Sequence, residues 1–589
     1  MKNIKKVALP IAIVLVAVVV LRVTAITLTG LGSSSVGIKG PSLSGSISGL
    51  NGTFGGIMPS LSTSVSMDAA VAGNTIGFSV GGAKDINNFR ENIENGYFPI
   101  STDITINGLF YDYYFETGNS GKASDELFSP AYSVALSRDP VSNKLEYYIT
   151  VGLNSNIKES DFARKKLNLV VALDISGSMS SGFNSYYYDN PLEYENEYKS
   201  KMQIANESLN ILLDQLKDDD RFGLVLFESN ATTMKDLELL EETNIERLKQ
   251  RILQIQETGG TNMEAGYREA TELLDEYIDV DSDEYENRII IITDAMPNTG
   301  RTDRESLIGM VENNADDGIY TTFIGVGVDF NTQLIQTISD VKGANYYSVH
   351  SSKEFEERMG EQFEYMVTPL VFDLELELDS DDYEIEAVYG SDTVDKKSGT
   401  IMEVNTLFPS KSEGGQVKGG VILLKLEKEN QKDEGELELK VTYKDRNGNK
   451  HENEQVVTLK DDGKEHYDNT GIRKAIMLTR YANTLKNWIL YERSEERKFL
   501  IRPEIGICDC MIVEPQEVYE LLGEWERTSV ELTVSDEYKE IFRDLKEYME
   551  EEMEELNDDD LEQEIDILKE LIKHKNKLIN IEEPINVWF

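Results

Sequence analysis

Basic residues and cysteine are scarce in this sequence, and each shortage excludes a class of protein. The 589 residues include 58 Lys and Arg against 108 Asp and Glu, which gives a formal net charge of −50. Binding to nucleic acid needs basic side chains that neutralise phosphates, so we expect no nucleic-acid partner. The two cysteines, Cys508 and Cys510, are too few for a disulfide framework or a zinc ribbon. The acidic excess is most simply a solvated surface, and it favours cations as small partners.

Long apolar runs are also scarce, and the clearest one is at the N-terminus. Lysines precede an apolar stretch from Val7 to Leu21, a pattern that is typical of an export signal or a signal anchor. We assign this segment to residues 1–29, and we assign the stretch rich in Gly and Ser at residues 30–66 to a flexible tether. The sequence therefore predicts a single-pass cell-membrane protein with the bulk of the chain outside. If the segment is cleaved, the protein is instead secreted.

Apolar strands alternate with amphipathic helices over residues 167–367. The runs "LNLVVALD", "RFGLVLFE", "RIIIITD" and "YTTFIGVGV" are nearly continuous in apolar residues, and a helical pattern follows each of them after a connecting segment. Strands of this kind, separated by helices, form a mostly parallel sheet with helices on both faces. The sequence therefore predicts a Rossmann-like α/β domain in this region.

The regions on both sides of the α/β domain have the alternating pattern of antiparallel strands. Residues 67–166 contain a few such strands, for example "AYSVALSRD", and residues 368–462 contain enough to indicate a β-sandwich. The early strands are too few to form a core alone, so we expect them to pair with the later ones. Residues 463–589 are expected to form a C-terminal helical region, either docking helices or a coiled coil.

Three loops are predicted to meet at the edge where the parallel strands end. The loop "DISGS" carries Asp174, Ser176 and Ser178, the loop "ETGGTNMEAG" carries Thr261, and Asp294 ends the strand before "AMPNTG". Ligands of α/β sheets bind at the carboxyl ends of the strands. All five side chains offer hard oxygen atoms, which suit Mg²⁺, Mn²⁺ or Ca²⁺ and disfavour zinc and copper. Each residue alone could be a helix cap, but their shared position favours a metal site.

The motifs "DISGSM", "GGTNMEAG" and "TDAMPNTG" resemble the metal-ion-dependent adhesion site of the von Willebrand factor type A domain. The resemblance covers residues 167–367 and matches all five positions in order. It implies a divalent cation, usually Mg²⁺, that the three hydroxyls hold while the two aspartates bind it directly or through water. It also implies an open position for a carboxylate of a partner.

The flanking motifs "NNFRENIENGYFP", "VGLNS" and "GIRKA" are similar to those of exported bacterial and archaeal proteins with this domain. They are similar more loosely to inter-alpha-trypsin inhibitor heavy chains. The resemblance therefore extends beyond the α/β domain, with less specific motifs.

A stretch rich in tyrosine follows the first motif. It contains Tyr186, Tyr187 and Tyr188 in succession, and we expect these residues to contact a ligand. Tyrosine recurs at recognition surfaces because it gives a large contact area at little ordering cost. Two alternatives stay open: the loop folds onto its own aromatic residues, or it covers the metal site.

The sequence predicts a membrane-tethered binding or adhesion protein that acts outside the cytoplasm. Through its cation it would engage a protein or a cell-surface polymer with an acidic group. The alternative is a structural or assembly module of the cell envelope in which the cation only stabilises the loops. We predict no enzymatic activity, because no histidine is among the expected ligands and no Ser-His-Asp spacing or P-loop is visible.

Overall fold

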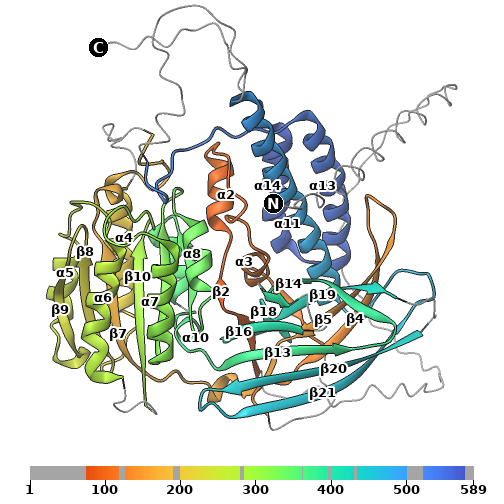
Figure 1. Cartoon of the computed structure of the whole chain (residues 1–589), viewed down its shortest axis with the longest axis horizontal. Coiled ribbons are helices and arrows are strands. Elements are labelled where there is room, and N and C mark those ends of the chain that lie inside the picture. Colours follow the sequence, from red (N-terminus) through yellow and green to blue (C-terminus); the bar gives the residue numbers. More distant parts are fainter. Residues whose placement is uncertain are drawn as a thin grey trace, which may run out of the picture. The chain divides into compact units, whose positions relative to one another are not determined.

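The computed structural model describes residues 75–118, 126–189, 199–278, 284–360, 362–391, 393–395, 401–429, 434–500 and 522–576. The predicted signal segment, the predicted tether and the two cysteines lie outside these residues. The described residues form an α/β unit, antiparallel sheets and a group of long helices (Figure 1).

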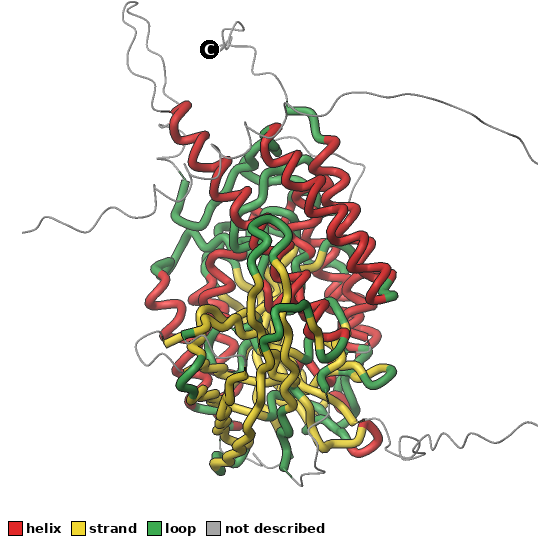
Figure 2. Tube along the Cα trace, turned by 90° about the vertical axis from the view of Figure 1, so that its right-hand side faces the viewer, coloured by secondary structure: helices red, strands yellow, loops and turns green. Residues whose placement is uncertain are grey.

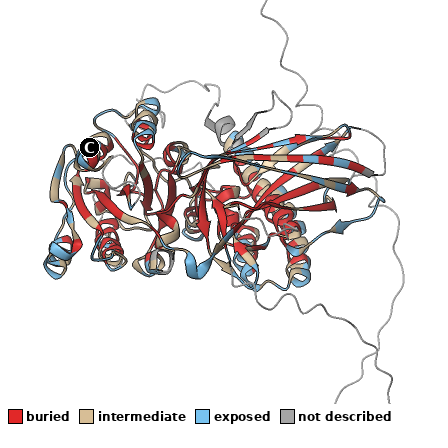
Figure 3. Ribbon diagram, turned by 90° about the horizontal axis from the view of Figure 1, so that it is seen from below, coloured by how far each residue is buried: buried red, intermediate tan, exposed pale blue. Residues whose placement is uncertain are grey.

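The α/β unit is built on a seven-stranded sheet that is parallel except at one edge, where β9 runs antiparallel to β8. The predicted apolar strands form its centre, and their residues are buried along the strands (Figure 3). The edge strand β9 is not predicted by the sequence pattern, because it is mostly polar and partly exposed. In spatial order the strands are β2 (Gly82–Ala83), β12 (Asn345–Val349), β11 (Ile319–Val326), β10 (Tyr285–Thr293), β7 (Lys166–Asp174), β8 (Arg221–Phe227) and β9 (Ala231–Leu239).

Helices cover both faces of this sheet, as predicted. Alternate residues of β7 explain the two layers: Leu169 and Val171 belong to one hydrophobic cluster, and Val170 and Ala172 belong to the other. One face is covered by α4 (Lys201–Leu213), α5 (Ile245–Ile252), α9 (Ser352–Gly360) and α10 (Phe363–Met366). The other face is covered by α6 (Met263–Leu274), α7 (Arg304–Asp316) and α8 (Thr332–Ser339).

The antiparallel strands form two sheets around one hydrophobic core, with strands from both sides of the α/β unit. The predicted pairing of early with late strands is observed, since β5 pairs with β19 and β1 pairs with β16. One sheet contains β21 (Lys450–Lys460), β20 (Glu434–Asp445), β13 (Val371–Asp379), β16 (Ile401–Ser410), β1 (Thr75–Val80), β6 (Asn154–Lys158) and β15 (Thr393–Asp395). The other contains β14 (Tyr383–Tyr389), β19 (Val421–Lys428), β5 (Leu145–Gly152), β4 (Ala131–Arg138) and β22 (His466–Tyr467).

The helical region packs around the fully buried Trp488 of the longest helix, α11. Its partners include segments from the N-terminal flank, so this core also joins distant parts of the chain. Figure 2 shows the long helices running side by side. The elements are α2 (Asn87–Glu94), α3 (Ile106–Tyr111), α11 (Thr470–Leu500), α13 (Asp536–Leu556) and α14 (Glu562–Lys573), with a small sheet of β3 (Tyr114–Glu116), β17 (Ser412–Glu413) and β18 (Gln416–Lys418).

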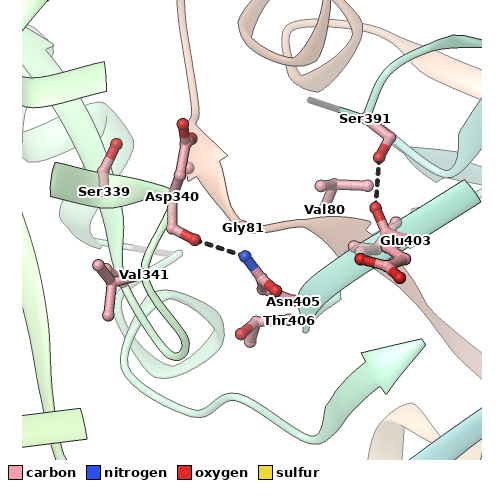
Figure 4. Close-up of a pocket in the computed structure, with 12 residues that line it drawn as sticks. Val80, Gly81, Ser339, Asp340, Val341, Ser391, Glu403, Asn405 and Thr406 are labelled. Carbon is pink, nitrogen blue, oxygen red and sulfur yellow. Dashed lines mark hydrogen bonds between the residues drawn. The ribbon is translucent and has the colours of Figure 1, made fainter. Parts of the chain in front are cut away.

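A small cavity of about 90 Å³ lies where the end of α8 meets strand β16 of the antiparallel sheets (Figure 4). The Asn405 amide donates a hydrogen bond of 2.7 Å to the carbonyl of Asp340, and this bond ties the two units together. None of the predicted metal ligands lines the cavity.

The predicted single-pass localisation requires correction. Within the described parts of the chain, we find no helix whose length and apolar character would allow it to cross a bilayer. The segment on which the prediction was based, residues 1–29, lies outside the described residues. The predicted contact with a membrane through residues 1–29 is likewise not supported, since no described helix could cross a bilayer.

Candidate metal centre

The first motif turns sharply after β7, and hydrogen bonds fix its carboxylate. Asp174 is fully buried; its Oδ1 accepts the backbone N–H of Ser176 at 2.8 Å and its Oδ2 accepts the hydroxyl of Thr293 at 2.6 Å. The hydroxyl oxygens of Ser176 and Ser178 lie 3.0 Å apart. Two hydroxyls and a carboxylate therefore converge at the end of one strand.

Backbone hydrogen bonds hold the second motif against the first. The N–H of Gly177 donates to the carbonyl of Gly259 at 3.0 Å, and the N–H of Thr258 donates to the carbonyl of Ile175 at 2.6 Å. Gly259 has a φ of +72°, which favours glycine at this turn. Thr261 follows two residues later and is 1% exposed, so the predicted second loop reaches the same edge of the sheet.

The third motif places Asp294 beside a buried lysine that the sequence did not indicate. The Lys201 ammonium lies 3.0 Å from Asp294 Oδ2 and 2.7 Å from Asp329 Oδ1, and all three side chains are fully buried. Lys201 begins α4 directly after Ser200, which caps the helix in a reciprocal pair with Gln203. Lys201 therefore enters the site from a fixed helix end.

Gly327 makes room for this lysine. It has a φ of +93°, and a Cβ at this position would lie 2.9 Å from Cε of Lys201. The "GVGVD" segment at the end of β11 therefore needs glycine at position 327, and Asp329 follows two residues later.

Three buried carboxylates, those of Asp174, Asp294 and Asp329, give the site a high density of negative charge. Burial, and then the charge of Asp294, raise the pKa of Asp174 to about 7. Burial also raises the pKa of Asp329, although Lys201 acts in the opposite direction. Burial disfavours the charge of Lys201, but the two carboxylates outweigh this effect and raise its pKa. One ammonium therefore partly compensates three carboxylates, which leaves a place for further positive charge.

The residues present fit a hard divalent cation. Asp294 Oδ1 is buried and has no hydrogen-bond partner among the described residues, whereas Oδ2 accepts a hydrogen bond from Lys201. An unpaired buried carboxylate oxygen is costly, and a cation would satisfy it. In the described residues there is no group of three or more His, Cys, Asp or Glu that could hold a metal. The predicted set differs from such groups because three of its five members are hydroxyls.

The three tyrosines have different surroundings. Tyr186 is 3% exposed, and its hydroxyl donates to the Oδ1 of Asn92 at 2.7 Å. The Tyr187 hydroxyl lies 3.6 Å from the position that a Cβ on Gly177 would take, and Tyr188 is partly exposed. Tyr187 and Tyr188 are thus at the rim of the site, whereas Tyr186 holds the loop in place.

Two further side chains lie at this edge: Asn298 accepts the backbone N–H of Thr261 at 2.9 Å, and its amide donates to Glu526 at 3.0 Å. Sequence reasoning missed these two residues as well as Lys201 and Asp329. Asp329 had a usable signal, because it lies three residues after the buried strand β11, much as Asp174 ends β7 and Asp294 follows β10. Asn298 lies within the third motif, which was a signal for it. Lys201 and Glu526 had no signal, since a helix start and a segment more than two hundred residues away supply them.

Comparisons with known proteins match the central part of the chain. The family model described as the von Willebrand factor type A domain matches residues 169–296. Inter-alpha-trypsin inhibitor heavy chain H2 of Mesocricetus auratus is 23% identical over 207 residues, which cover 35% of this chain and 20% of that protein. Heavy chain H4 of Homo sapiens is 26% identical over 214 residues, with coverages of 35% and 20%. The chain thus spans about a fifth of the length of these relatives.

Among solved structures, a von Willebrand factor type A protein from Catenulispora acidiphila has a TM-score of 0.38 and 16% identity, covering 62% of this chain and 82% of that chain. The residues that the family model matches include most of β7, the first two motif loops, all of β10 and Asp294. The central α/β unit of this chain is therefore a von Willebrand factor type A (VWA) domain.

Proposed function

We propose that the VWA domain binds an acidic group of a protein or cell-surface polymer through a divalent cation, with Mg²⁺ preferred and Mn²⁺ or Ca²⁺ as alternatives. The observation that carries this proposal is the unpaired, buried Oδ1 of Asp294 at the strand edge that also holds the paired serine hydroxyls. The hydroxyls of Ser176, Ser178 and Thr261 would hold the cation together with Asp174 and Asp294. When bound, the cation would supply the attraction for a carboxylate of the partner.

The charges of the site favour such a partner despite the acidic chain. The formal charges of Asp174, Asp294 and Asp329 add to −3, and those of Lys201 and a divalent cation add to +3. The occupied site is then neutral, so it does not repel an acidic group although the whole chain carries −50. At contact distance the ion dominates the local field.

The partner would also meet the tyrosines at the rim. Tyr187 and Tyr188 offer aromatic area next to the metal site, whereas Tyr186 is already used inside the protein. We therefore assign ligand contacts to Tyr187 and Tyr188 and a positioning role to Tyr186.

A thermal-shift experiment tests for the cation. It compares Asp174→Asn with Asp219→Asn, which removes a carboxylate that is 54% exposed. Mg²⁺ at a hundred times its dissociation constant adds about 2.7 kcal/mol, so the melting temperature should rise by about 5–10 °C. We expect this rise in the unsubstituted protein and in Asp219→Asn, and its loss in Asp174→Asn.

Recovery of cell-surface material on immobilised protein tests for the partner. We expect recovery in Mg²⁺ and its loss in chelator or with Asp174→Asn. Equal recovery in all samples would contradict cation-dependent binding. A melting rise without Mg²⁺-dependent recovery would indicate the alternative, in which the cation only stabilises the loops. The absence of enzymatic activity stays a prediction.

A further inference from the structure

A segment from the C-terminal region crosses the metal-site edge of the VWA domain. We call residues 522–534 the strap; it runs from the VWA domain to the start of α13 (Figure 1). Trp525 anchors it, because this side chain is 4% exposed and belongs to the hydrophobic cluster of α6, α7 and α8. Its indole N–H donates to the carbonyl of Thr302 at 2.7 Å, and its own carbonyl accepts from the Asn331 amide at 2.8 Å.

The strap also contacts the tyrosine segment, residues 186–189. The Arg527 guanidinium lies over the ring of Tyr186 and donates to its hydroxyl at 3.2 Å, and it donates to the carbonyl of Phe330 at 3.0 Å. Two residues later, the N–H of Ser529 donates to a carboxylate oxygen of Asp189 at 2.8 Å. The strap is therefore bound on both sides of Glu526.

Glu526 is the acidic residue that these anchors place at the rim of the site. Its Oε1 accepts the hydroxyl of Tyr188 and the amide N–H of Asn298, the latter at 3.0 Å. The same Asn298 accepts the backbone N–H of Thr261 at 2.9 Å through its Oδ1. One amide thus connects Glu526 to the loop of a predicted metal ligand. Burial raises the pKa of Tyr188, and the charges of Glu526 and Asp294 both add to this effect.

We propose that the strap occupies the ligand face, which is the surface of the VWA domain where an external ligand would bind. Glu526 is then the chain's own carboxylate at the cation site. This inference rests on the proposed function, because it assumes that a cation binds there. An external ligand must displace the strap. We therefore expect the ligand to resemble the strap, as a peptide in which an aromatic residue precedes an acidic one. The aromatic side chain would fill the place of Trp525, and the acid would take the place of Glu526.

Tethering explains why the site would be selective. A segment of the same chain acts at an effective concentration on the order of millimolar, so a weak external carboxylate cannot replace it. A partner must supply both the aromatic and the acidic contact to compete. This requirement distinguishes a specific partner from the many acidic surfaces that the cation alone would attract.

The first arm of the test measures Mn²⁺ affinity by titration calorimetry. Glu526→Gln removes the charge but keeps a side chain of the same size, and Glu524→Gln makes the same change at an exposed neighbour. We expect Glu526→Gln to bind Mn²⁺ about tenfold more weakly than the unsubstituted protein, because a carboxylate near the cation is lost. Glu524→Gln should bind Mn²⁺ as the unsubstituted protein does.

The second arm tests displacement with a fluorescent peptide that has the sequence of residues 522–534. Trp525→Ala vacates the apolar site in the chain, and we expect the peptide to bind this variant at least about tenfold more tightly than it binds the unsubstituted protein. Chelator should weaken this binding, as should a peptide with Gln in place of the residue that corresponds to Glu526.

The outcomes separate the two proposals. No binding of Mn²⁺ to the unsubstituted protein would overturn the proposed function and this inference together. Mn²⁺ binding that is the same in all three proteins would overturn the strap inference alone. Equal binding of the Glu and Gln peptides to Trp525→Ala would also overturn it, because the strap would then dock only through its aromatic residue.

Discussion

Lys201→Met is the substitution that tests the charge arrangement of the site most directly. The ammonium contacts Asp294 and Asp329 at 3.0 and 2.7 Å, and the three side chains are fully buried. Removing one member of a buried ion pair leaves uncompensated charge and costs about 3–5 kcal/mol. For a domain of this size the melting temperature should fall by about 10 °C in chelator.

A divalent cation should reverse part of this loss. In Lys201→Met the two aspartates have lost their counter-charge, so Mg²⁺ should raise the melting temperature more than it does in the unsubstituted protein. Differential scanning calorimetry in chelator and in Mg²⁺ measures both quantities. The control is Lys199→Met, whose side chain is 54% exposed and pairs with Glu207 at the surface, so its cost should stay below about 1 kcal/mol. Our reasoning would be refuted if Lys201→Met melted within a degree or two of Lys199→Met in chelator.

Two further predictions concern the flanks of the VWA domain. A Cβ on Gly471 would lie 1.9 Å from the carbonyl oxygen of Glu116, so Gly471→Ala should cost about 1–3 kcal/mol in denaturant unfolding, whereas Gly309→Ala in the open face of α7 should be neutral or slightly stabilising. Burial, and then the charge of Lys418, lower the pKa of Lys84 well below its ordinary value, so the unfolded state binds more protons and stability rises with pH above neutrality. Lys84→Met should lack this rise when unfolding is measured at pH 7 and pH 10, and an unchanged pH dependence would contradict the prediction.

Strands with a clear hydrophobic pattern could be predicted from the sequence, and strands at edges or with mixed patterns could not. β7 and β10 are buried on both faces, so their apolar runs are unmistakable. β9 lies at an edge of the sheet, where its side chains are partly exposed and polar residues are tolerated. Its sequence therefore lacks the hydrophobic pattern that predicts a strand. β16 contains Pro409, a residue that argues against a strand, yet it pairs with β1, β13 and β15.

The same distinction applies to the site. Asp174 ends the apolar strand β7 and Asp294 directly follows the apolar strand β10, so a local pattern is enough to find them. Lys201 and Glu526 reach the site only through tertiary structure, the first from a helix start and the second from a segment beyond the antiparallel sheets. Their positions in the site depend on tertiary contacts, which a local sequence pattern does not predict.

Helix α2 shows why the flanks belong with the VWA domain in one functional unit. Three of its polar residues, Asn88, Arg90 and Asn92, are buried. Asn92 donates to the carbonyl of Val328 at 2.9 Å and accepts from Tyr186, next to the rim of the site. Two residues earlier, Arg90 pairs with the fully buried Glu564 of α14. Because such buried pairs are costly to break, a shift of the tyrosine segment would be opposed by the helical core. The motif "NNFRENIENGYFP" is therefore explained by contacts on both sides of one helix, which connect the ligand face to the same C-terminal region that supplies the strap.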